Sequence, residues 1–278
     1  MHKFLRAIGF SDITKKDLEM ILDEVITRPE IMKITKDSEG NEFAELSGSF
    51  AANAGITVRG TYQEDDSFHM DYYYPYVFGT SITTNEQIDV EKHAEKESYA
   101  GVCDEVNLGV TLIFYIQNVA DYLAETNRHL SKIHYGAMLA GLSTEGKILC
   151  PVVERKKNDV PAIQKNDRHN QLIAQAREGD EDAIESLTLE DMDTYALLSQ
   201  RVMKEDIFSI VKSTFMPFGI ESDQYTVLGE IIDCVTMENK LTHEKLYGMK
   251  LLCNNIQFDV CINEKDLLGE PAIGRRFR

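Results

Sequence analysis

The chain has 278 residues, of which 43% are hydrophobic and 27% are charged, and its formal net charge at pH 7 is −18. This composition is typical of a folded globular protein with room for two ordinary domains, and it excludes a disordered or fibrous chain. The excess of acidic residues disfavours nucleic acid and anionic membranes as partners, because binding to phosphate groups needs clustered Lys and Arg side chains.

The cysteines and the hydropathy pattern predict a cytoplasmic protein. Five cysteines are spread along the chain without a CxxC pair, at Cys103, Cys150, Cys234, Cys253 and Cys261. This spacing is typical of reduced thiols rather than of a disulfide framework or a zinc site. The N-terminus has no continuous apolar stretch like that of a signal peptide. The longest apolar run, residues 110–116, is far shorter than the roughly 20 residues that a membrane span requires.

A helix is predicted close to the N-terminus. Thr14 and Asp17 have the spacing of a capping box, and Pro29 ends the helical pattern. Between them, apolar residues at helical spacing form one stripe: Leu18, Ile21, Leu22, Val25 and Ile26. We expect this helix to pack on a sheet.

From residue 30 to about residue 149 the apolar pattern has a period of two, which indicates mainly antiparallel strands. Residues 56–63 and 68–76 are predicted to form a hairpin, with Tyr72, Tyr74 and Tyr76 in the core and Tyr73 outside. Residues 110–116 are predicted to form a strand buried on both faces, followed by a short helix capped by Asn118.

A polar stretch over residues 155–168, which contains Pro161, is expected to separate two domains. The first, residues 1–153, is predicted to be a mainly antiparallel β domain with flanking helices. The second, residues 154–278, is predicted to hold a helical connector and a small β-barrel-like module, OB-like or SH3-like. The predicted fold class is therefore α+β: a helix-flanked antiparallel sheet, then a helical segment, then the C-terminal module.

The sharpest structural prediction concerns the last hairpin. A two-residue turn at Asn254 and Asn255 sets opposed apolar pairs on one face and places Lys250 opposite Asp259 on the other. Residues 225–236, with a bulge at Gly229, are expected to add a third strand, and residues 274–278 the start of a fourth. A strand that ends there has an open edge, so we infer that the natural chain continues beyond Arg278, and self-association as a homodimer stays open.

Four stretches of the sequence resemble a bacterial family that is defined only as a domain of unknown function. They are residues 2–10 (HKFLRAIGF), 179–195 (GDEDAIESLTLEDMDTY), 215–225 (FMPFGIESDQY) and 269–277 (GEPAIGRRF). The likeness extends over the whole length of the chain. It implies a bacterial and cytoplasmic origin, and no activity, cofactor or catalytic residue can be carried over from it.

The polar face of the hairpin at residues 56–76 is the candidate binding face. In the expected register Thr61 faces Asp71 and Arg59 faces Tyr73, with His69 on the same surface. His69 and Asp71, two residues apart on one strand, have the chemistry of an oriented acid and base pair. A solvated sheet face has the same composition and needs no function, so both interpretations remain open.

No motif for a cofactor, a metal or a known catalytic group is found, so none of these is assigned. The preferred prediction is a non-enzymatic binding or regulatory protein whose partner is a protein or a small ligand. One alternative is a hydrolase-like enzyme that uses His69 and Asp71. Another is a module that binds single-stranded nucleic acid through a basic patch at Arg275, Arg276 and Arg278.

Overall fold

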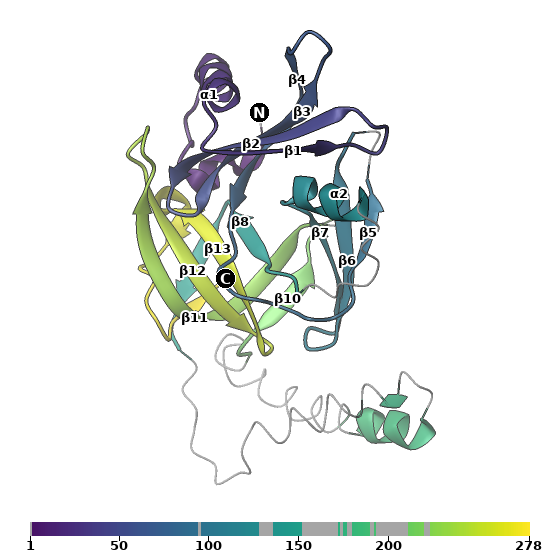
Figure 1. The fold of residues 1–278 in the computed structure, drawn as a ribbon. Coiled ribbons are helices and arrows are strands. Elements are labelled where there is room, and N and C mark those ends of the chain that lie inside the picture. Colours follow the sequence, from purple (N-terminus) through teal and green to yellow (C-terminus); the bar gives the residue numbers. More distant parts are fainter. Residues whose placement is uncertain are drawn as a thin grey trace.

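The computed structural model describes residues 2–93, 96–127, 136–151, 211–219 and 223–278, together with 172, 175–176, 180–189 and 192. Strands dominate this part of the chain and only a few helices accompany them (Figure 1). The α+β character predicted from the sequence is therefore confirmed at this coarse level. The strands form three sheets, described in turn below.

The first sheet is antiparallel, with its four strands in chain order. They are β1 (Ile31–Lys36), β2 (Glu42–Ala51), β3 (Ala54–Tyr62) and β4 (Phe68–Val77). Two helical elements, η1 (Lys3–Ile8) and α1 (Lys15–Thr27), precede it. In α1 the Thr14 side chain accepts a hydrogen bond from the Asp17 N–H, as the capping pattern predicted.

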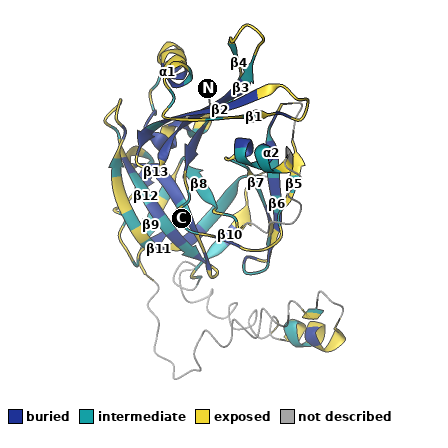
Figure 2. Cartoon of the chain, viewed as in Figure 1, coloured by how far each residue is buried: buried dark blue, intermediate teal, exposed yellow. Residues whose placement is uncertain are grey.

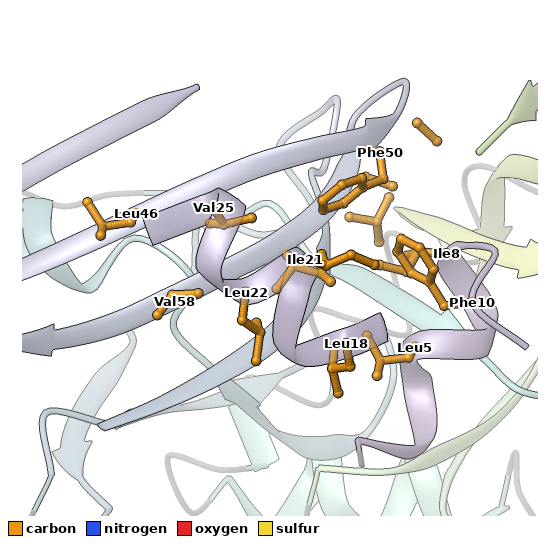
Figure 3. Packing of buried hydrophobic residues seen from close by; sticks show 14 of the residues in the cluster. Leu5, Ile8, Phe10, Leu18, Ile21, Leu22, Val25, Leu46, Phe50 and Val58 are labelled. Carbon is orange, nitrogen blue, oxygen red and sulfur yellow. The ribbon is translucent and has the colours of Figure 1, made fainter. Parts of the chain in front are cut away.

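The apolar stripe of α1 packs on this sheet. Leu18, Ile21, Leu22 and Val25 are buried in one cluster with Leu46 of β2 and other strand residues (Figure 3). The predicted packing of the helix on a sheet is thus confirmed. Figure 2 shows the contrast along this layer: buried residues fill most of β2 and β3, whereas the outer side of α1 and the tip of the β3–β4 hairpin are exposed.

The second sheet has three antiparallel strands, β5 (Asp89–Lys92), β6 (Tyr99–Glu105) and β7 (Val110–Tyr115), and α2 (Val119–Asn127) follows. The prediction that residues 110–116 are buried on both faces is wrong. Of the β7 residues only Leu112 is fully buried, because only the face of β7 that carries Val110, Leu112 and Phe114 packs on the core.

The third sheet has eight strands and combines distant parts of the chain. Its first members are β8 (Ala140–Ser143), β9 (Gly146–Leu149) and β10 (Thr214–Pro217). They are followed by β11 (Tyr225–Glu238), β12 (Lys245–Cys253), β13 (Ile256–Asn263), η2 (Glu264–Asp266), β14 (Leu267–Leu268) and β15 (Arg276–Phe277). The strand order is β14-β9-β15-β11-β12-β13-β8, with β10 paired to β11.

The predicted register of the β12–β13 hairpin is confirmed. Asn254 and Asn255 have φ angles of 45° and 69°, and the paired residues include Lys250 with Asp259. Two consecutive positive φ angles are what a two-residue hairpin turn requires, and Asn tolerates them better than most residues. The bulge expected at Gly229 lies instead between Ile231 and Asp233.

The eight-stranded sheet curls strongly. Only Thr144 and Glu145 separate β8 from β9, although these strands lie toward opposite ends of the strand order. The hydrogen-bonded ladder is interrupted at that point, so the sheet is not closed into a barrel, and the expected OB-like or SH3-like module is not confirmed. The separation of domains between residues 153 and 154 stays a prediction.

The open strand edge expected near Phe277 is not present in the described part of the chain. Phe277 and Arg276 in β15 pair with β11 on one side and with β9 on the other. The sequence could not show this because β9 lies more than a hundred residues upstream. Self-association therefore stays a prediction, but an open edge at β15 no longer supports it.

Glu97 joins the loop between β1 and β2 to the second sheet. Its carboxylate accepts hydrogen bonds from Ser38 Oγ at 2.5 Å, Lys92 Nζ at 2.8 Å and Tyr99 Oη at 2.5 Å. Burial by itself would raise the pKa of Glu97, but these three donors outweigh it and hold the pKa below the ordinary glutamate value.

Because this pKa is lowered on folding, ionised Glu97 stabilises the protein above the unfolded pKa and loses that effect as the pH falls through the folded pKa. We expect Glu97→Gln to reduce the free energy of unfolding by about 1–3 kcal/mol at pH 7. Urea unfolding followed between pH 7 and pH 3 should show the difference from wild type shrinking at low pH. A difference that does not change with pH would contradict the assignment, and Ser38→Ala should give a smaller version of the same effect.

Candidate functional site

A cleft of about 1780 Å³ has lining residues from all three sheets. Four runs of at least five consecutive residues line it: residues 72–76 in β4, residues 112–118 from β7 onward, residues 136–147 around β8, and residues 223–227 at the start of β11. Successive side chains of a strand point to opposite faces, so a run of consecutive lining residues indicates that the strand presents its edge. β4, β7 and β8 are each the last strand of their sheet in the observed strand order. The cleft is therefore bordered by three sheet edges.

The walls of the cleft carry large apolar side chains that are exposed to solvent. Their exposed fractions run from 41% at Phe78 to 70% at Leu268. The set comprises Ile31, Phe78, Tyr115, Met138, Phe218 and Leu268. Exposed apolar side chains are ordinary when scattered singly, but their collection around one concave surface is typical of a binding site.

One wall of the cleft is polar and is organised by Arg59 of β3. Only 3% of Arg59 is exposed, and its guanidinium contacts the carboxylate of Glu45 on the neighbouring strand β2 at 2.8 Å. The guanidinium also donates to the hydroxyl groups of Tyr72 at 2.9 Å and Tyr74 at 2.7 Å. A third set of acceptors comes from the turn before α2, where the carbonyl oxygen of Gln117 lies 2.8 Å away. Arg59 thereby joins the first sheet to the second.

Burial controls the protonation of this cluster. It raises the pKa of Glu45, and the charge of Arg59 only partly offsets the effect. It also raises the pKa of Tyr74 well above its ordinary value, so this hydroxyl stays protonated and donates to the Gln117 carbonyl oxygen at 3.0 Å. Each of the three guanidinium nitrogens of Arg59 donates to a protein acceptor, so the cluster holds the cleft together rather than offering a charge to a ligand.

The structure does not bring the predicted binding face together in the expected register. The hairpin turn between Gln63 and Ser67 places Thr61 opposite His69, and a bulge between Arg59 and Gly60 then places Arg59 opposite Tyr72. The predicted pairs of Thr61 with Asp71 and of Arg59 with Tyr73 are therefore wrong. Both errors have a local cause, because the sequence shows neither the register that the turn sets nor where the ladder gains one residue.

His69, Asp71 and Tyr73 lie in different surroundings. His69 is exposed beside the hairpin tip, and the Asp71 carbonyl oxygen accepts from Lys96 Nζ at 2.5 Å. Tyr73 packs against the core under α1, and its hydroxyl accepts from the His2 N–H at 3.3 Å. Neither His69 nor Asp71 lines the cleft.

Three of the four tyrosines of β4 lie elsewhere than predicted, whereas Tyr76 is buried as expected. The bulge turns Tyr72 and Tyr74 toward Arg59, while Tyr73 faces the core. Alternation alone assigned the larger tyrosine set to the core, and Tyr76 is indeed buried. Because Tyr72 and Tyr74 were assigned to the core, the sequence did not predict the polar wall around Arg59. The signal that could have found it is the need of a buried arginine for several acceptors on one strand face.

The three C-terminal arginines do not form one basic patch. Arg276 is 6% exposed and donates to the carbonyl oxygens of Cys150 at 2.9 Å and Val211 at 2.8 Å. Arg275 donates to the carbonyl oxygen of Glu270 at 2.7 Å. Arg275 and Arg278 are exposed, so two of the predicted residues reach solvent and the third ties neighbouring segments together.

Within the described ranges, no three His, Cys, Asp or Glu side chains are grouped as they would be around a metal ion. None of the helices in those ranges has the length and apolar character needed to cross a lipid bilayer.

Comparison with known proteins gives a family for this chain. A search of curated proteins found no match, and neither did a search of solved structures. One family model matches residues 5–278, and its description is "Domain of unknown function, E. rectale Gene description (DUF3881)". The match covers nearly the whole chain, as the resemblance of the four sequence stretches predicted. The chain therefore belongs to the DUF3881 family.

Proposed function

We propose that this protein is a non-enzymatic binding protein that holds an amphipathic ligand in the cleft between its three sheets. The observation that carries the proposal is the collection of exposed apolar side chains around a concave surface of about 1780 Å³. Ligand sites are concave and mostly apolar, with a few polar groups that fix orientation. The curled eight-stranded sheet then serves as the barrel-like recognition module, with β8 and β10 at the cleft.

The charges around the cleft favour a neutral or cationic ligand. The described lining residues include seven carboxylate side chains and four Lys or Arg side chains. Two of these cations are already in ion pairs, Arg59 with Glu45 and Lys33 with Asp121. Carboxylates such as Glu86 and Glu145, which are exposed, add to the negative potential of a chain whose net charge is −18. Anionic ligands are disfavoured here.

The two alternative functions receive less support from this geometry. A hydrolase that uses His69 and Asp71 needs both side chains in one concave site, and neither lines the cleft. Binding of single-stranded nucleic acid needs a continuous basic groove with aromatic side chains. Arg276 is buried and engaged with carbonyl groups, which breaks the predicted patch.

The cleft can be tested with Nile red, a neutral apolar dye. We expect saturable binding with a blue-shifted emission, because the dye would leave water for an apolar surface. Replacing Phe78 and Phe218 together by alanine should weaken the binding about tenfold, since each ring contributes apolar contact area. The measurement is a fluorescence titration at fixed dye concentration.

The matched control is Leu241→Ala combined with Ile273→Ala. Both side chains are large, apolar and at least half exposed, but neither lines the cleft. This control should bind the dye like wild type. Equal loss in both double variants, or no saturable binding to the wild-type protein, would contradict a ligand site in the cleft.

A further inference from the structure

We propose that the ligand is an extended polypeptide segment that adds as a new strand to the edge of β7 inside the cleft. This inference rests on the proposed binding function and specifies the class of ligand. Addition of a strand to a sheet edge is an established mode of peptide recognition, in which main-chain hydrogen bonds give affinity and side-chain pockets give specificity.

The first observation concerns the direction of the main-chain groups of β7. Within the described residues, β7 pairs with β6 and with no other strand. The Ile116 N–H donates to the Tyr99 carbonyl oxygen at 2.9 Å, which turns Ile116 toward the strand that contains Tyr99. The main-chain N–H and C=O groups of successive residues in a strand point alternately to one side and to the other. Ile113 therefore turns its N–H and C=O away from β6 and toward the cleft.

The second observation is that a side chain already occupies the place of the next strand. The hydroxyl of Tyr225 accepts from the Ile113 N–H at 2.7 Å and donates to the Ile113 carbonyl oxygen at 3.2 Å. A single hydroxyl thus satisfies both main-chain groups of one residue, as a neighbouring strand would. Tyr225 begins β11 and lines the cleft itself. An incoming peptide can replace it with its own C=O and N–H.

The third observation is the chemistry of the surroundings. The edge of β7 faces a cleft that is also bordered by the edges of β4 and β8, so a chain lying there passes main-chain groups on more than one side. Apolar side chains such as Phe218 and Met138 offer surface for alternate residues of the peptide. The lining has an excess of carboxylates, which includes Asp223 beside Tyr225. This excess favours basic residues at the peptide positions that alternate with the apolar ones. The ligand should be a segment in which apolar and basic residues alternate.

The test uses the full chain and a fluorescein-labelled nonapeptide in which lysine and valine alternate. We expect saturable binding by fluorescence polarisation, and competition with Nile red. A counterpart with glutamate in place of lysine should bind at least about tenfold more weakly because of the negative lining. The same basic peptide with every backbone amide N-methylated should also lose about tenfold or more, because it can no longer donate to the edge of β7.

Tyr225→Phe tests the role of the resident hydroxyl. Without it, the Ile113 N–H and C=O lose a partner in the free protein, so the basic peptide should bind about three- to tenfold more tightly. Tyr247→Phe is the matched control. The Tyr247 hydroxyl donates to Glu264 and the side chain does not line the cleft, so its change should leave peptide affinity unaltered.

The outcomes separate this inference from the function on which it rests. Nile red binding without binding of the basic peptide would overturn strand addition and leave the cleft as a site for another amphipathic ligand. Equal binding of the N-methylated peptide would overturn it as well, since the main chain would then not be recognised. Weaker peptide binding by Tyr225→Phe, with Tyr247→Phe unchanged, would overturn strand addition at Ile113, since the hydroxyl would then not compete with the peptide. Loss of Nile red binding would remove the proposed function itself.

Discussion

Replacing Arg59 by methionine should lower the free energy of unfolding by about 3–5 kcal/mol. The side chain is 3% exposed and donates to Glu45, two tyrosine hydroxyls and the turn before α2. Its removal leaves the Glu45 carboxylate buried without its cation and leaves several acceptors unpaired, which is the most costly way to break a buried pair. Urea unfolding at pH 7, followed by circular dichroism, measures the difference.

Two further variants show whether the cost comes from the charge left behind. The double variant Glu45→Met with Arg59→Met removes both charges and should recover part of the loss, because well-packed apolar residues can replace a buried ion pair. Lys240→Met breaks an exposed pair with Glu30 and should cost at most about 1 kcal/mol. If Arg59→Met cost no more than Lys240→Met, the buried cluster would not hold the sheets together.

The second large effect is expected at Gly55, where β2 and β3 approach closely. A Cβ atom at this position would lie 2.1 Å from the backbone carbonyl oxygen of Gly48 and 2.8 Å from the Tyr76 hydroxyl. A backbone oxygen in a paired strand cannot move without disturbing the ladder, so Gly55→Ala should cost about 2–3 kcal/mol. Thermal unfolding should show a Tm lower by about 5–10 °C, given 2–4 °C per kcal/mol for a chain of this size.

Gly141→Ala is the control for this prediction. Gly141 also lies in a strand, β8, but a Cβ atom there meets no other atom within 4 Å. Its replacement should change the Tm by no more than about 2 °C, in either direction, because the effects on chain entropy are small. A Tm for Gly55→Ala equal to that of Gly141→Ala would mean that β2 and β3 separate easily at this point.

Local signals in the sequence were enough for several elements. The cap at Thr14, the apolar stripe behind it and Pro29 together determine α1, because these interactions lie within a few turns of one helix. The turn at Asn254 and Asn255 fixes the register of the last hairpin, since each strand pair follows from the one before it. Both predictions depend only on neighbours in the chain.

The candidate site was not visible in the sequence to the same degree. Arg59 was placed on the candidate binding face, but a bulge and the turn before α2 enclose it in the structure. The cleft itself needs edges from β4, β7 and β8, which are far apart in the chain. Residues that line it, such as Phe218 and Met138, carry no sequence pattern that distinguishes them from core residues.

The sequence by itself determined the strand-rich character, α1, the C-terminal hairpin and the likeness to the DUF3881 family. Tertiary structure alone decided which strands end each sheet, where β15 finds its two neighbours and which charged side chains are buried. The physical reason is the range of the interactions. Caps and turns are settled within a few residues, whereas a sheet edge is defined by the strands that do not pair with it, and these can come from anywhere in the chain.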